Sequence, residues 1–192
     1  MVAQKVVSKA EGRIAHAPTL ADHHRLVLQE ARRVRRRRGD LFVVETRQGF
    51  VCANAGIDRS NTPGDDLLVL LPVDPDASAR TLREGLAARL GVAPAVVVSD
   101  SFGRAWRQGI AGVAIGVAGM LPLLDLRGSP DRRGRTLEAT TIAVADELAS
   151  AAELVMGKAD GIPAALIRGV AVPEGDGRAS DLVMPPERDL FP

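Results

Sequence analysis

A run of small and apolar residues at positions 109–124 most constrains what this chain can fold into. The run is shorter than the ~20 apolar residues that a membrane span needs, and four glycines and Pro122 interrupt it. It therefore predicts a buried core segment or a backbone-rich loop of a globular protein. The single cysteine, Cys52, excludes an intrachain disulfide and a cysteine-based metal site.

The composition is that of an ordinary globular protein. The 192 residues are 46% hydrophobic and 26% charged, which suffices for one full core or two small cores that share a sheet. A formal net charge of +1 provides no global field that would favour nucleic acid or an anionic membrane as partner. The first residues lack the apolar core of a signal peptide, so we expect a cytoplasmic protein.

Strand-like and helix-like segments are intermixed without regular alternation. Short apolar runs predict strands at residues 2–7, 41–45, 50–53, 67–73, 95–98, 121–126 and 164–167. Helical patterns cover residues 20–37, from Asp76 or Ser78 to Leu90, and 144–156. We expect Thr19 to cap the first helix and Gly157 to end the last. This order favours an α+β fold with a mixed sheet and flanking helices, followed by a frayed tail after Pro173.

The loop at residues 55–64 holds the first candidate site. Asp58 and Asn61 are three residues apart after a predicted strand, so both side chains can turn toward one point. They would offer an oxygen ligand for a divalent cation beside a donor for a phosphate or base. The alternative is ordinary turn chemistry.

Residues 99–109 form the second candidate. Asp100 and Ser101 follow a buried strand at the end where open sheets place their sites, and both can ligate metals. Arg104 and Arg107 can bind phosphate oxygens bidentately, which makes them candidate catalytic clamps. The alternative is a surface loop of ion pairs with Trp106 packed against it.

Two further segments suit a phosphate. Residues 153–163 lead from a helix end into a loop with Lys158, Asp160 and Gly161, which can wrap a nucleotide or can be a simple helix stop. Lys9 follows a predicted strand and can reach a phosphate as a mobile charge. The chain has only three lysines against 22 arginines, so lysines at two such places favour phosphate loops; the alternative is that they are scattered surface residues.

The arginine run at residues 32–38 resembles a nucleic-acid patch. At the end of a predicted helix it is better explained as a solvated face that complements the helix dipole. The chain contains no P-loop, no dinucleotide-binding glycine pattern and no G-x-S-x-G motif. Covalent hydrolysis is therefore not indicated.

Five stretches between residues 2 and 170 together resemble the coenzyme F-420 gamma-glutamyl ligase family: VSKAEGR, ETRQGFVCANAGIDRSN, LLPVDPDASA, VVVSDSFGRAWRQGIAGVAIGVAG and ATTIAVADELASAAELVMGKADGIPAALIRG. The resemblance implies that family's ligase fold as one domain over residues 1–172, with a tail at 173–192. It implies GTP-dependent ligation: a carboxylate of the deazaflavin precursor is activated as an acyl phosphate, and the amine of L-glutamate displaces the phosphate. It also implies a homodimer and two Mg²⁺ or Mn²⁺ ions.

The resemblance also assigns residues. Asp58 and Asp100 match ligands of one metal ion, and Ser101 matches a ligand of the second. The residues matched to GTP binding are Lys9, Asn61, Met156, Gly157, Lys158, Ala159, Asp160, Gly161, Ile162 and Pro163. Arg104 and Arg107 are not assigned by the resemblance. Their candidate role as clamps follows only from the ability of guanidinium groups to bind phosphate oxygens.

The chain departs from the family pattern at three places. Lys158 stands where relatives present a ligand of the second metal, and a protonated lysine cannot ligate one. Gln4 stands where Ser or Thr is frequent. Relatives carry a further segment before the equivalent of Val2, so we expect either that Met1 is not the true initiator or that the chain is truncated at its N-terminus. The alternative function is accordingly a non-catalytic, degenerate relative that binds GTP or phosphate with a metal.

Overall fold

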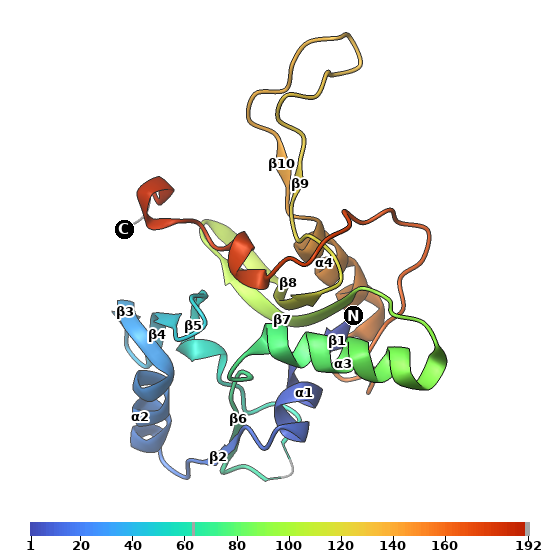
Figure 1. The fold of residues 1–192 in the computed structure, drawn as a ribbon. Coiled ribbons are helices and arrows are strands. Elements are labelled where there is room, and N and C mark those ends of the chain that lie inside the picture. The colour runs from blue at the N-terminus through green and yellow to red at the C-terminus, as the bar shows by residue number, and fades with distance from the viewer. Residues whose placement is uncertain (63, 191–192) are drawn as a thin grey trace.

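The computed structural model describes residues 1–62 and 64–190 (Figure 1). At its centre lies a mixed sheet, in which β7 (Val96–Arg104) pairs in parallel with the short β1 (Val2–Ala3). The other edge of β7 pairs antiparallel with β8 (Arg107–Ala118). The predicted α+β class with a mixed sheet is therefore confirmed.

The glycine-rich run forms most of β8, and its glycines make room for two helices. A Cβ atom on Gly112 would lie 2.7 Å from the carbonyl oxygen of Ala149 in α4 (Val144–Met156). A Cβ atom on Gly116 would collide with the carbonyl oxygen of Pro75 in α3 (Pro75–Leu90). Both helices therefore pack directly on the β8 backbone, and the first hydrophobic core lies around this contact.

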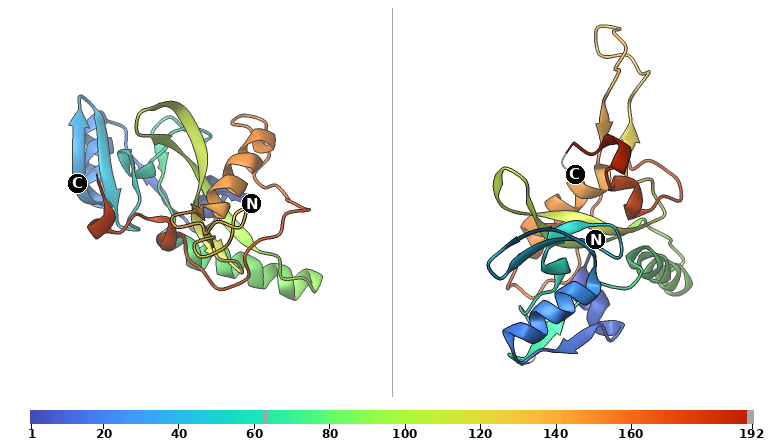
Figure 2. Two further views of the ribbon diagram at one scale, coloured as in Figure 1. Left: turned by 90° about the horizontal axis from the view of Figure 1, so that it is seen from above. Right: turned by 90° about the vertical axis from the view of Figure 1, so that its left-hand side faces the viewer.

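A second, smaller core lies beside the first, and it is built around other sheets, so the two cores do not share a sheet, contrary to expectation. It is built from Val27, Val44 and Leu68, all fully buried. The elements around it form a three-stranded antiparallel sheet, a helix and a two-stranded ladder: α2 (Leu20–Glu30), β3 (Ala31–Arg38), β4 (Leu41–Thr46), β5 (Val51–Ala53), β2 (Ile14–His16) and β6 (Leu67–Val69). Figure 1 labels this region from β2 to β6, and Figure 2 shows it in two further views.

The prediction of a strand at residues 2–7 is wrong for the residues after Ala3. The chain turns there into the helix α1 (Gln4–Ala10). The buried Gln4 side chain fixes the start of this helix, because its Nε2 donates to Ser8 Oγ at 2.8 Å and to the carbonyl oxygen of Leu70 at 3.0 Å. These two bonds outweigh the strand preference of the valines.

The helix predicted at residues 20–37 is wrong in its second half. Thr19 caps α2 as expected, but the helix ends at Glu30 and the arginines continue as the edge strand β3. A two-residue turn at Gly39 and Asp40 folds β3 back onto β4, and Glu45 of β4 binds the guanidinium groups of Arg32 and Arg35. The arginine run is therefore one strand of a hairpin and does not complement a helix dipole.

Arg37→Ala is expected to leave turnover unchanged, because Arg37 lies in β3 over the ring of Phe42, 4.7 Å from its centroid. The loss of this cation–π contact should lower the free energy of unfolding by about 0.5–1 kcal/mol. Steady-state kinetics and a thermal melt check both parts. A large fall in turnover would show that this strand contacts a substrate.

Other boundaries differ from the expectations in smaller ways. Asp74 caps α3, since its carboxylate accepts from the amide of Ala77 at 2.8 Å, so neither Asp76 nor Ser78 is the cap. The strand predicted at 67–73 is confined to β6, and that at 121–126 to β9 (Leu124–Asp125), which pairs with β10 (Thr141–Ile142). Between β9 and β10 the chain forms the arm that projects from the body in Figure 1. Residues 164–167 form only one bridge, between Ala164 and Val2.

The C-terminal segment is anchored to the body around Ala179, so it is not frayed there, whereas residues 184–188 are exposed. Asp76 Oδ1 accepts from the amide of Ala179 at 3.0 Å, and Ala179 is fully buried in the first core. The segment forms the short 3₁₀ helices Ala179–Leu182 and Pro186–Arg188. No helix among the described residues has the length and apolarity to cross a membrane.

Candidate active site

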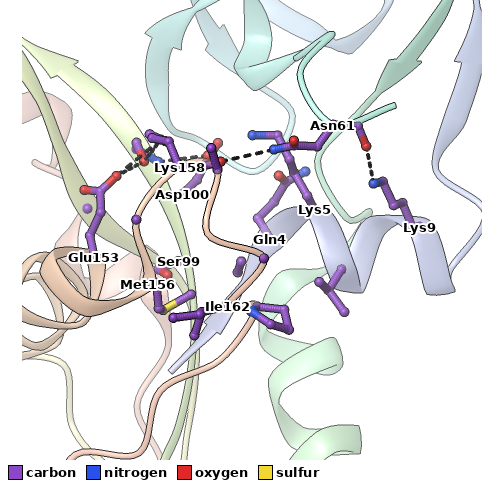
Figure 3. A pocket seen from close by; sticks show the side chains of 18 residues that line it. Gln4, Lys5, Lys9, Asn61, Ser99, Asp100, Glu153, Met156, Lys158 and Ile162 are labelled. Atoms are coloured by element: carbon purple, nitrogen blue, oxygen red, sulfur yellow. Dashed lines mark hydrogen bonds and ion pairs between the residues drawn. The ribbon is translucent and has the colours of Figure 1, made fainter. Parts of the chain in front are cut away.

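A pocket of about 320 Å³ opens where α1, the middle of β7, the end of α4 and the following loop meet (Figure 3). Its walls come from both ends of the sequence because β1 pairs with β7 and the amide of Ala3 donates to the carbonyl oxygen of Pro163 at 2.8 Å. The pocket therefore collects segments that the sequence analysis treated as separate candidates.

All three lysines of the chain line this pocket, whereas none of its 22 arginines does. Lys5 and Lys9 are four residues apart in α1 and so lie on one face of the helix. Lys9 Nζ donates to the carbonyl oxygen of Asn61 at 2.5 Å, and Lys5 Nζ lies 2.6 Å from Asp58 Oδ2. Lys158 enters from the loop after α4. The three ammonium groups give the pocket the charge that suits a phosphate ligand.

The two predicted metal ligands lie close together. Burial raises the pKa of Asp100 to about 6, and the negative charge of Asp58 adds to the rise although Lys5 and Lys158 oppose it. Burial also acts to raise the pKa of Asp58, but bonds from Lys5 and Ser60 outweigh it and hold that pKa below its usual value. Asp100 is thus a half-buried carboxylate that its neighbours stabilise only in part.

Behind Asp100 lies Cys52 of β5. Burial, followed by the charge of Asp100, raises the pKa of the Cys52 thiol to about 12. The thiol therefore stays protonated at neutral pH and is not a nucleophile.

Ser101, Glu153 and Lys158 form a polar cluster on the other side of the pocket. The Ser101 hydroxyl donates to Glu153 Oε1, and Lys158 Nζ donates to Ser101 Oγ at 2.5 Å. Lys158 Nζ also lies 3.2 Å from Glu153 Oε1. Asn61 Nδ2 donates to the carbonyl oxygen of Lys158 at 3.3 Å, so the cluster is connected to the loop that carries Asp58. Figure 3 shows these contacts as dashed lines.

The loop after α4 closes the pocket. Gly157 ends the helix with φ +59°, and a Cβ atom there would collide with the carboxylate of Asp160. In Figure 3 the side chains of Met156 and Ile162 lie on one side of the pocket and the charged groups on the other. The pocket thus has an apolar part and a cationic part. The segment predicted to bind a nucleotide contributes most of its residues to the lining: Met156, Gly157, Lys158, Ala159, Gly161, Ile162 and Pro163.

The structure does not bring Arg104 and Arg107 to the pocket. They face each other across the turn at the tip of the β7–β8 hairpin, both are exposed, and neither is part of the pocket lining. Trp106 occupies the turn between them with φ +57° and an 80% exposed side chain. Their assignment as phosphate or substrate clamps stays a prediction.

The two carboxylates fit one divalent cation whose coordination shell is completed by water and by a bound substrate. Among the described residues no group of three His, Cys, Asp or Glu side chains could hold a metal ion, so a closed protein cage is not formed. Asp58 and Asp100 offer two carboxylates, and the half-buried Asp100 carboxylate would be stabilised by a cation. Mg²⁺ favours such sites, with one or two carboxylates, waters and substrate phosphates.

Two charged residues of the lining, Lys5 and Glu153, are not among the site residues predicted from the sequence. Lys5 was not assigned because the segment was interpreted as a strand, and a helix would have placed it with Lys9. Glu153 lies in the last turn of α4, where a carboxylate opposes the helix dipole. An acidic residue at that position is a signal for a nearby cation, here Lys158.

Comparison with known proteins identifies the family. The family model for F420-0:Gamma-glutamyl ligase matches residues 1–169. A protein of Methanocaldococcus jannaschii named coenzyme F420:L-glutamate ligase is 45% identical over 86% of this chain and 66% of its own length. A protein of the same name from Methanothermobacter thermautotrophicus is 44% identical over the whole of this chain and 83% of its own length. The chain therefore belongs to the F420-0:gamma-glutamyl ligase family.

Proposed function

We propose that this protein joins L-glutamate to the deazaflavin precursor of coenzyme F-420, and that GTP drives the reaction. The observation that carries the proposal is the pocket lined by all three lysines and Asp100, with Asp58 paired to Lys5 beside it. Relatives that bear the ligase name match the segments that form it. A cationic pocket with two adjacent carboxylates suits a nucleotide and its metal ion.

The proposed reaction has two steps. First, a carboxylate oxygen of the precursor attacks the terminal phosphorus of GTP, the bond to the bridging oxygen breaks, and GDP leaves. Second, the α-amine of L-glutamate attacks the acyl carbon, a C–N bond forms, the C–O bond to phosphate breaks, and the amine loses a proton. Inorganic phosphate is the second product.

The residues of the pocket bind and orient the phosphates in this proposal. Lys5, Lys9 and Lys158 offset the negative charge of the phosphate oxygens, and the amide of Asn61 orients the nucleotide. The loop of residues 156–163 contributes backbone groups and an apolar surface for the base. Asp58 and Asp100 would hold a Mg²⁺ or Mn²⁺ ion. The bound ion supplies charge neutralisation during phosphoryl transfer.

The proposal also includes the role of the two arginines at the hairpin tip, the homodimer and the cytoplasmic location. Arg104 and Arg107 would bind an anionic part of the precursor that extends to the tip of the hairpin. The 90% exposed Leu154 and the 66% exposed Val155 on the outer face of α4 support a homodimer, because burial of such side chains favours association. The enzyme would work in the cytoplasm, where GTP is available.

Lys9→Gln is expected to raise the Kd for GTP about tenfold or more, because the ammonium group would lose a charge-assisted bond to phosphate worth about 1.5–3 kcal/mol. The measurement is calorimetric titration with a non-hydrolysable GTP analogue. Arg132→Gln removes the same charge from the exposed arm and serves as the matched control. Equal affinities of Lys9→Gln and the wild type would contradict the assignment of Lys9.

Label transfer tests the proposed route. The precursor is prepared with isotopically labelled oxygen in its reacting carboxylate and incubated with GTP, L-glutamate and Mg²⁺ or Mn²⁺. An acyl phosphate predicts labelled inorganic phosphate in the mass spectrum. Metal-dependent GTP binding without product would instead identify the non-catalytic relative.

A further inference from the structure

Lys158 lies where its ammonium group meets both oxygen donors on one side of the pocket. Its Nζ is 2.5 Å from Ser101 Oγ and 3.2 Å from Glu153 Oε1, while Ser101 donates its own proton to Glu153. The carboxylate of Glu153 is thus already neutralised by a cation of the chain itself.

The position of Lys158 is fixed by its surroundings. It directly follows Gly157, whose left-handed φ of +59° ends α4, and its carbonyl oxygen accepts from Asn61. The side chain is 56% exposed, so the ammonium group faces both the cluster and the solvent-filled side of the pocket. The loop geometry therefore presents this charge to any ligand that enters.

The chemistry of an ammonium group excludes a metal ion from the same oxygens. Lysine has three N–H donors and no lone pair when protonated, so it cannot ligate. A divalent ion bound to Ser101 and Glu153 would need oxygen distances of ~2.1 Å, which would place it against the ammonium charge. One N–H group of Lys158 donates to Ser101 Oγ, and the ammonium group forms an ion pair with Glu153. Since lysine has three N–H donors, it can also donate to a phosphate oxygen.

The ammonium group of Lys5 likewise neutralises one carboxylate of the pair, since it lies 2.6 Å from Asp58 Oδ2, but it does not pair with the other. The only hydrogen bond that the Asp100 side chain accepts among the described residues comes from the amide of Ser101. Asp100 keeps an oxygen without a cationic partner. The two sides of the pocket are therefore different: one can accept a metal ion and the other is occupied by Lys158.

We propose that Lys158 is a built-in cation that replaces a second divalent ion, so that the protein uses a single Mg²⁺ or Mn²⁺ at Asp58 and Asp100. Lys158 then contacts the phosphate that a second ion would otherwise bind. The inference rests on the proposed nucleotide site but concerns the number of metal ions and does not depend on ligation itself.

Counting Mn²⁺ ions tests this proposal. The protein is saturated with a non-hydrolysable GTP analogue, and bound Mn²⁺ per chain is determined from the electron paramagnetic resonance of the free ion. The wild type should bind one Mn²⁺ with a mononuclear spectrum. Lys158→Gln, which supplies an amide oxygen in place of the ammonium, should bind two Mn²⁺ with a spin-coupled spectrum. Lys158→Arg and the control Arg132→Gln should each bind one.

Two Mn²⁺ in the wild type, or a single Mn²⁺ in folded Lys158→Gln, would overturn the inference. Thermal melts establish that the variants are folded. Absence of bound Mn²⁺ in the wild type would overturn the carboxylate site and the inference with it. One bound Mn²⁺ in the wild type, two in Lys158→Gln and no glutamate ligation would overturn only the proposed function.

Discussion

Asp100→Asn is expected to abolish glutamate ligation and at the same time to stabilise the fold. The activity is lost because an amide cannot supply the negative charge that a divalent cation needs from this position. The stability rises because the folded protein must bury an ionised carboxylate, whose pKa is raised from 3.8 to about 6 by burial. A shift of this size corresponds to about 3 kcal/mol at neutral pH.

The stabilisation has a defined pH dependence. The folded protein holds the Asp100 proton more tightly than the unfolded chain, so the wild type loses stability as the pH rises from about 4 to about 6. Above pH 6 the loss is complete. The gain of Asp100→Asn over the wild type should therefore be largest above pH 6 and should vanish below pH 4, in thermal melts without divalent cations.

Asp125→Asn is the matched control. Asp125 lies on the exposed arm, where bonds from Arg127 lower its pKa to about 2. This variant should keep full ligase activity and should not become more stable at neutral pH. Unchanged turnover in Asp100→Asn would contradict the metal assignment, and a loss of stability at pH 7 would contradict the account of its burial.

Gly116→Ala is expected to have the largest effect on stability. The new Cβ atom would collide with the carbonyl oxygen of Pro75, which belongs to the backbone and cannot rotate away. The first turn of α3 would have to leave β8, and Asp76, whose carboxylate accepts from the amide of Val117, would lose that bond. We expect a cost of about 3 kcal/mol or more. Urea denaturation measures it.

Two other glycines provide the controls. A Cβ atom on Gly103 in β7, or on Gly85 in α3, would meet nothing within 4 Å. Gly103→Ala should change the free energy of unfolding by less than about 0.5 kcal/mol, and Gly85→Ala should raise it by about 1 kcal/mol because alanine favours the helix. Equal effects of Gly116→Ala and Gly103→Ala would show that close packing of α3 on β8 is not required.

The two carboxylates were recognisable from local patterns, although Asp100 lies within β7 and not after its end as predicted. Asp58 and Asp100 each follow an apolar segment directly, and such segments are recognisable without knowledge of the fold. The capping of α2 by Thr19 and the end of α4 at Gly157 were predictable for the same reason. These features depend on neighbours in the sequence.

The features that the sequence did not predict depend on distant partners. Arginine favours helices, and only the pairing with β4, with Glu45 opposite, makes residues 31–38 a strand. Likewise, Gln4 starts a helix because it bonds to Leu70, which is 66 residues away. The helix places Lys5 in the pocket, so the position of Lys5 could not be predicted while the segment was interpreted as a strand.

The most direct test of the account is the ligation itself. The purified chain is incubated with GTP, L-glutamate, the glutamate-free deazaflavin precursor and Mg²⁺ or Mn²⁺, and the deazaflavin products are analysed by mass spectrometry. The account predicts glutamylated product that requires GTP and is absent with Asp100→Asn. Product that forms equally without GTP, or no product from folded protein that binds GTP and Mn²⁺, would contradict it.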